Sequence, residues 1–62
     1  MSLYSIRYKG CLAQQDTKTL EVFVRKIGGT LYPEMRCLAG EKLSAKELRM
    51  YVNRYLTEVV SA

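Results

Sequence analysis

The period of the hydrophobic pattern changes once along this chain, and the change separates a β-rich part from a helical part. Between residues 3 and 39, apolar residues recur at every second position, as in strands that bury one face. From residue 44 onward they recur at three- and four-residue steps, as on one side of a helix. The sequence therefore predicts an α+β fold in which one C-terminal helix packs on one face of an antiparallel sheet.

The helix has a defined start at Ser44. Ser44 and Glu47 form an S-x-x-E capping box, in which each side chain bonds a backbone N–H at the other end of the first turn. Leu43 and Leu48 occupy the two positions of a hydrophobic staple. We expect a helix over residues 44–60, with an apolar stripe made of Ala45, Leu48, Val52, Tyr55, Leu56 and Val59.

The β-rich part divides into three predicted strands, over residues 3–13, 18–27 and 30–39. Gly28 and Gly29 accept the positive φ angles of a two-residue turn between the second and third strands. Pairing Ile27 with Thr30 across this turn makes the apolar faces coincide. The same register gives the pairs Val24–Pro33, Val22–Met35 and Leu20–Cys37 on one face, and Glu21–Arg36 and Arg25–Tyr32 on the other.

The first strand needs one further device to join this sheet. Closing a hairpin over residues 14–17 puts Ala13 opposite Lys18 and Cys11 opposite Leu20. Because that count sends Tyr8 to the wrong face, we expect a β-bulge at Gly10, which restores the parity. The predicted architecture is a three-stranded meander followed by the helix, β-β-β-α, with the proline-containing third strand at the sheet edge.

A helix over residues 16–27 is the alternative. Leu20, Phe23 and Ile27 stand at helical spacing, Asp16 is a candidate N-cap and Gly28 a candidate C-cap, so the fold would become β-α-β-α. The Val-Phe-Val segment is β-prone, and a helix would leave the agreement across the Gly-Gly turn as a coincidence. These two observations favour the strand.

Chain length and residue usage limit the classes of function. The 62 residues suit one small domain, 1–62. No apolar run is long enough to span a bilayer and the start does not resemble a signal peptide, so we expect a cytoplasmic protein. With two cysteines and no histidine, we expect reduced thiols and neither a metal nor another cofactor. The scattered carboxylates and absent histidine also argue against an enzyme.

The candidate binding residues are cations and aromatic side chains on the sheet face away from the helix. A merely solvated face would not require the exposed apolar groups that Ile27 and Leu38 add to it. The formal net charge of +4 makes a phosphate-bearing partner more favourable. The predicted site residues are Arg7, Lys9, Phe23, Arg25, Tyr32 and Arg36.

We expect a small basic, regulatory binding module, with nucleic acid, specifically DNA, as its first candidate partner. Arginines on a sheet can bind phosphates or guanine edges, and aromatics can stack on bases. At the level of architecture, the sheet-plus-helix plan resembles the DNA-binding domains of phage integrases and plant AP2-type factors, without a shared motif. The alternative is a protein partner, either a second copy in a homodimer or a larger target bound by a small inhibitor or accessory protein.

Overall fold

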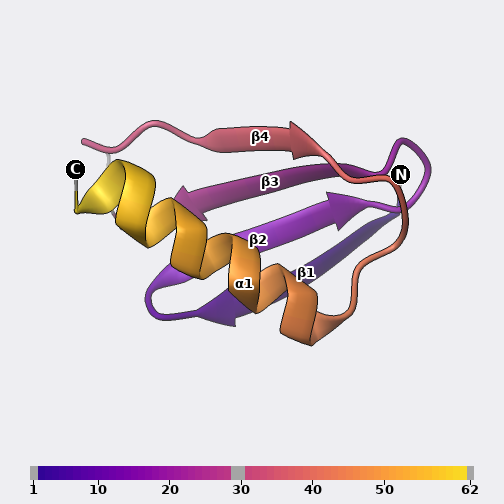
Figure 1. The fold of residues 1–62 in the computed structure, drawn as a ribbon, viewed down its shortest axis with the longest axis horizontal. Coiled ribbons are helices and arrows are strands. Elements are labelled where there is room, and N and C mark those ends of the chain that lie inside the picture. The colour runs from indigo at the N-terminus through magenta and orange to yellow at the C-terminus, as the bar shows by residue number, and fades with distance from the viewer. Residues whose placement is uncertain (1, 29–30, 62) are drawn as a thin grey trace.

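The computed structural model describes residues 2–28 and 31–61, and it shows an α+β fold with one helical segment crossing one face of an open antiparallel sheet (Figure 1). The sheet has four strands in the order β1-β2-β3-β4. Their bounds are Leu3–Tyr8 for β1, Cys11–Asp16 for β2, Glu21–Lys26 for β3 and Met35–Leu38 for β4. The α-helix α1 spans Ala45–Tyr55 and continues into a π-helical turn, η1, over Leu56–Val60. The predicted fold class is confirmed, but the predicted number of strands is wrong.

The extra strand arises because residues 3–13 form a hairpin and not one bulged strand. Lys9 and Gly10 connect β1 to β2, and their φ angles of 50° and 72° are both positive. Two central residues with positive φ form a type I′ turn, which matches the twist of the flanking strands. The glycine therefore serves a tight turn where the sequence predicted a bulge.

The registers around β3 also differ from the predicted ones. Ala13 lies opposite Val24 and not Lys18, while Cys11 lies opposite Lys26 and not Leu20. Tyr8 pairs with Cys11 within the first hairpin and does not adjoin Val22. Cys11 and Ala13 nevertheless keep their predicted face, because each changes its partner by six residues and an even shift preserves the alternation along a strand.

The connection between β3 and β4 is longer than a two-residue turn. Val22 lies opposite Cys37 and Val24 opposite Met35, a shift of two residues from the predicted pairs. Because β4 begins at Met35, Pro33 lies before the strand and removes no ladder hydrogen bond. The predicted Ile27–Thr30 pair and the second glycine of the turn involve residues 29 and 30, which lie outside the described residues. The alternative helix over residues 16–27 is wrong, since β3 occupies half of that segment.

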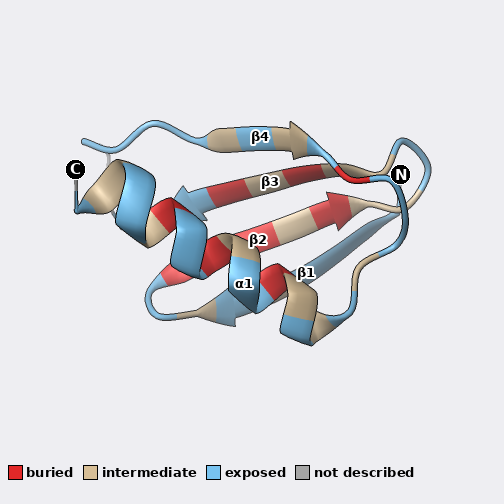
Figure 2. Ribbon diagram, viewed as in Figure 1, coloured by how far each residue is buried: buried red, intermediate tan, exposed pale blue. Residues whose placement is uncertain are grey.

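The core lies between the sheet and the helix, where the buried residues of both elements face each other (Figure 2). The capping box of Ser44 and Glu47 is present, so the predicted helix start is confirmed. At the other end, the buried Tyr55 donates its hydroxyl to the carbonyl of Pro33 at 2.8 Å. The buried apolar residues are Cys11, Ala13, Val22, Val24, Ala39, Leu48, Val52 and Tyr55.

One polar side chain, Gln15, is buried within this core, with 1% of its surface exposed. Its Nε2 donates to the carbonyl oxygens of Glu41 at 2.8 Å and Leu20 at 3.3 Å. Its Oε1 accepts the backbone N–H of Leu43 at 2.8 Å. A single amide thus joins β2 to the turn that follows it and to the segment that leads into α1.

The turn after β2 presents the backbone carbonyl of Leu20 to this amide. Leu20 has a φ of 66°, which is unfavourable for a residue with a side chain. The conformation is held by its N–H, which donates to the Asp16 carbonyl at 2.7 Å. Its carbonyl accepts the N–H of Ala39 at 3.1 Å in addition to the Gln15 amide. The strained residue therefore links the turn after β2 to the chain leaving β4.

The two cysteines both face the helix but lie far apart. Cys11 pairs with Lys26 and Cys37 with Val22, so they are separated by two strand spacings across the sheet and four residues along it. Strand geometry places their Cα atoms about 16 Å apart, whereas a disulfide needs them within about 7 Å. Both thiols are free. Burial raises the pKa of each above its ordinary value, with Lys26 near Cys11 and Arg54 near Cys37 partly opposing the effect.

Replacing Gln15 by Leu should destabilise the fold strongly. The substitution leaves the backbone groups of Leu20, Glu41 and Leu43 without their side-chain partner, and unsatisfied buried polar groups cost about 1–3 kcal/mol each. We expect the free energy of unfolding, measured by urea denaturation at low protein concentration, to fall by about 2–4 kcal/mol. The control is Gln14→Leu, whose amide donates to the exposed Ser5 hydroxyl, and it should change stability little. Equal, small effects of both substitutions would contradict the assigned role.

The thiols should react slowly and unequally with an alkylating reagent near neutral pH. Since burial raises the pKa of both groups, the reactive thiolate is scarce, and labelling should accelerate as the pH rises. Half-buried Cys37 should react before Cys11, which is fully buried. Mass spectrometry of timed samples measures the order, and a Cys37→Ser variant assigns the slow site. An intramolecular disulfide after mild oxidation would contradict the register.

Candidate functional site: the outer face of the sheet

The helical segment covers one face of the sheet, which leaves the opposite face open to solvent (Figures 1 and 2). Strand alternation and the observed registers place a mixed set of apolar, polar and charged side chains there. We call this surface the outer face. Two of its leucines are well exposed, Leu38 at 76% and Leu3 at 44%. Its residues are Leu3, Ser5, Arg7, Leu12, Gln14, Asp16, Glu21, Phe23, Arg25, Arg36 and Leu38, and the carboxylate of Glu34 joins them beside Arg36.

Four of the six predicted site residues fall on the outer face. These are Arg7, Phe23, Arg25 and Arg36, which come from three different strands. Gln14 separates Ser5 from Phe23, and Phe23 lies directly opposite Arg36, so these four form one row across the sheet. The alternation along the predicted strands thus located most of the cationic and aromatic residues of this surface.

The other two predicted residues, Lys9 and Tyr32, lie elsewhere. Lys9 is in the turn between β1 and β2, and its ammonium donates to the side-chain oxygen of Asn53 on α1 at 3.0 Å. It therefore points toward the helix-covered side. Tyr32 precedes β4 and has no strand partner, so the predicted Arg25–Tyr32 pair is wrong. Both residues were assigned to strands, but Lys9 lies in a turn and Tyr32 in a loop.

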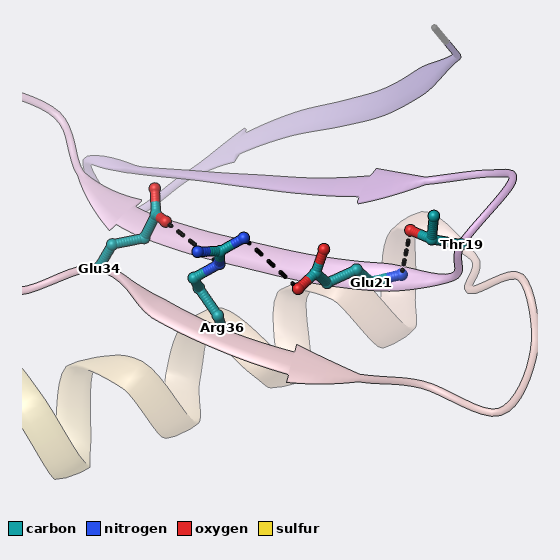
Figure 3. Close-up of polar contacts among 4 residues, drawn as sticks. All are labelled: Thr19, Glu21, Glu34 and Arg36. Carbon is teal, nitrogen blue, oxygen red and sulfur yellow. Dashed lines mark hydrogen bonds and ion pairs between the residues drawn. The ribbon is translucent and has the colours of Figure 1, made fainter.

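Arg36 is held by its neighbours on the outer face. Its guanidinium lies 3.5 Å from a carboxylate oxygen of Glu21 and 3.9 Å from one of Glu34 (Figure 3). The guanidinium carbon is also 5.0 Å from the centre of the Phe23 ring, a cation–π arrangement. Glu21 was predicted to lie directly opposite Arg36, but it lies opposite Leu38 and reaches Arg36 diagonally. The two carboxylates offset the charge of Arg36, and its guanidinium covers part of one face of the Phe23 ring.

Arg7 and Arg25 lie on either side of Leu12, in the row next to that of Phe23. Both arginines are exposed. Neither forms an ion pair with another residue in the described ranges 2–28 and 31–61. At the opposite end of the strands, Asp16 and Glu21 carry negative charge. Glu34 directly precedes β4 and places one carboxylate at the arginine end, so this end carries two cations and one anion, whereas the other end carries two anions (Figure 3).

Sequence reasoning missed two central members of the outer face, Leu12 and Gln14. The Gln14 amide donates to the hydroxyl of Ser5 at 3.2 Å and lies between Ser5 and Phe23 in the sheet. Assigning residues 14–17 to a turn hid this position and also hid the buried Gln15. The signal was available in Cys11, Ala13 and Gln15, which continue one strand face past the predicted end.

The remaining surfaces offer less defined chemistry. In the described part of the chain, no cluster of three or more potential ligand residues is placed to hold a metal ion. Residues 2–28 and 31–61 also contain no helix with the length and apolar character needed to cross a membrane. A shallow, open depression on the helix is lined by Met50, Tyr51 and Arg54. The outer face is therefore the best candidate for a binding surface.

Comparisons with known proteins add no relative from which a function could be transferred. No protein-family model matches the chain. Searches of curated proteins and of solved structures likewise return no significant match. Functional assignment consequently rests on the composition and geometry of the outer face.

Proposed function

We propose that this chain is a small, non-enzymatic interaction module that binds a protein partner through the outer face of its sheet. The observation that carries the proposal is the combination of exposed apolar side chains with a locally neutralised arginine. Leu38 is 76% exposed beside Arg36, whose charge is offset by Glu21 and Glu34. Protein interfaces commonly combine an apolar or aromatic centre with arginine and a polar rim.

The carboxylates favour protein over nucleic acid as the partner. A phosphate approaching Arg36 would meet Glu21 and Glu34 at the same guanidinium, and like charges placed together oppose binding. Phe23 is in addition partly covered by Arg36, which limits the stacking of a base on its ring. A protein surface can bury Leu3, Leu38 and the free edge of Phe23 without this electrostatic cost.

Nucleic acid remains the second candidate because of Arg7 and Arg25. These exposed arginines flank Leu12 and lack an ion pair among the described residues, and the chain carries a net charge of +4. Two arginines at one end of a sheet can neutralise phosphates without base contacts. The architectural resemblance to three-stranded DNA-binding domains gives this candidate less support, because the sheet has four strands.

Site-specific photo-crosslinking in the cells from which the chain derives tests the proposed surface. Benzoylphenylalanine replaces Leu38 on the outer face in one version and Met50 on the helix in the other, two positions with similar exposure of 76% and 62%. We expect a discrete protein adduct from the Leu38 position and little from the Met50 position. Excess wild-type protein should compete for the adduct, whereas a Leu38→Asp variant should not.

A titration with duplex DNA, single-stranded DNA and RNA at two salt concentrations completes the test. The protein proposal predicts weak binding that is not lost specifically in an Arg7→Ala/Arg25→Ala variant. Tight binding whose salt slope falls by about two units in that variant would favour nucleic acid instead, because each neutralised phosphate contributes about one unit. Equal protein adducts from the Leu38 and Met50 positions would overturn the outer face as the binding surface.

A further inference from the structure

We propose that the protein partner of the outer face is a second copy of this chain, packed face to face as a two-fold symmetric dimer. This inference rests on the proposed function, since it names the partner of the same surface. The feature that points to a second copy is the arrangement of charge along the strands, which makes the outer face complementary to itself.

The outer face consists of three rows that run across the sheet. One end row contains Arg7, Leu12 and Arg25, which are consecutive partners on β1, β2 and β3. The middle row contains Ser5, Gln14, Phe23 and Arg36. The other end row contains the partners Leu3 and Asp16 together with the partners Glu21 and Leu38. The basic and acidic rows are thus separated by one row of mixed polar and aromatic residues.

A two-fold axis along the middle row brings unlike ends together. Rotation about this axis exchanges the end rows while keeping each strand over its counterpart. Arg25 of one copy then faces Glu21 of the other, and Arg7 faces Leu3 with Asp16 as its neighbour. An axis parallel to the strands would instead place each end row on itself. Asp16 would then face Glu21, a like-charge contact at the acidic end, and Arg7 and Glu34 would meet at the other end. Charge complementarity therefore selects the first axis.

The centre of this arrangement is compatible with close packing. Phe23 lies on the axis and meets its own counterpart, which gives an aromatic pair in the middle of the interface. Arg36 also approaches its counterpart, but each guanidinium is accompanied by Glu21 and Glu34 of its own chain at 3.5 and 3.9 Å. The intramolecular ion pairs thereby reduce the repulsion that two facing arginines would cause.

The size of the outer face sets the expected strength of the dimer. Six-residue strands and four strand widths give a surface about 20 Å long and about 19 Å wide. Two such faces bury an area near the lower end for specific complexes, below about 1,200 Å² in total, where association is weak or transient. We therefore expect a reversible dimer with a dissociation constant in the micromolar range or weaker.

Reciprocal charge reversal tests the two-fold arrangement. Arg25→Glu and Glu21→Arg each replace both intermolecular Arg25–Glu21 contacts of a homodimer by like-charge contacts. We expect each variant alone to self-associate at least about tenfold more weakly than wild type in sedimentation equilibrium. An equimolar mixture of the two should recover dimers, because both contacts in the mixed dimer again join opposite charges. If the outer face instead bound a different protein, mixing the two variants would not restore dimers.

Matched variants control for net charge and folding. Lys46→Glu and Glu41→Arg make the same charge changes at exposed positions outside the outer face, and both should dimerise like wild type. The Leu38→Asp variant tests the same interface without changing the Glu21–Arg36 ion pair. Because Leu38 is 76% exposed, this variant should fold, and the added charge on the outer face should keep it monomeric. Circular dichroism confirms folding of every variant.

Three outcomes would overturn the second-copy proposal. They are a wild-type chain that stays monomeric at millimolar concentration, control variants that dissociate the dimer as strongly as Arg25→Glu, and a mixture that does not recover. The proposed function fails separately, if the Leu38 position yields no protein adduct in cells. An adduct between the Leu38 position and a different protein, with a monomeric wild-type chain, would sustain the outer face and reject the second copy.

Discussion

The buried amide of Gln15 is the interaction on which the two-sided character of this fold depends. It bonds the Leu20 carbonyl in the turn after β2 and the backbone of Glu41 and Leu43 in the segment before α1. Because hydrogen bonds need defined directions, the amide ties the segment that leads into α1 to the helix-covered face of the sheet, next to the Ser44 cap. Apolar packing by the buried Leu48 and Val52 holds α1 on the same face.

Because the helix packs on one face of this single-layer sheet, the other face of the sheet stays exposed. In a chain of 62 residues there is no second layer among the described elements to shield Leu3, Phe23 and Leu38. Such a surface either remains solvated or serves an interface, and the exposed Leu38 beside a neutralised Arg36 supports the proposed interface. The small size of the domain also explains why the proposed binding surface is a flat sheet face and not a pocket.

Sequence patterns predicted the faces of the strands better than their partners. Side-chain alternation is local, so Val22, Val24 and Cys37 were assigned to the helix-covered face even though the β3–β4 register was wrong by two residues. The Ser44–Glu47 capping box is equally local, and it predicted the helix start. Lys9 was misplaced because the Lys9–Gly10 turn was interpreted as a bulge, and Tyr32 because β4 begins only at Met35. The role of Gln15 was hidden because its partners lie as far as 28 residues away.

The most direct test of the account is to map which surface responds when molecules of the chain meet. Backbone and side-chain chemical shifts are recorded by NMR while the protein is diluted from millimolar to low micromolar concentration. The account predicts concentration-dependent shifts on the outer face, centred on Leu12, Phe23 and Arg25, with the helix residues Lys46 and Met50 unchanged. Shifts confined to α1, or no shifts at any concentration, would contradict self-association through the outer face.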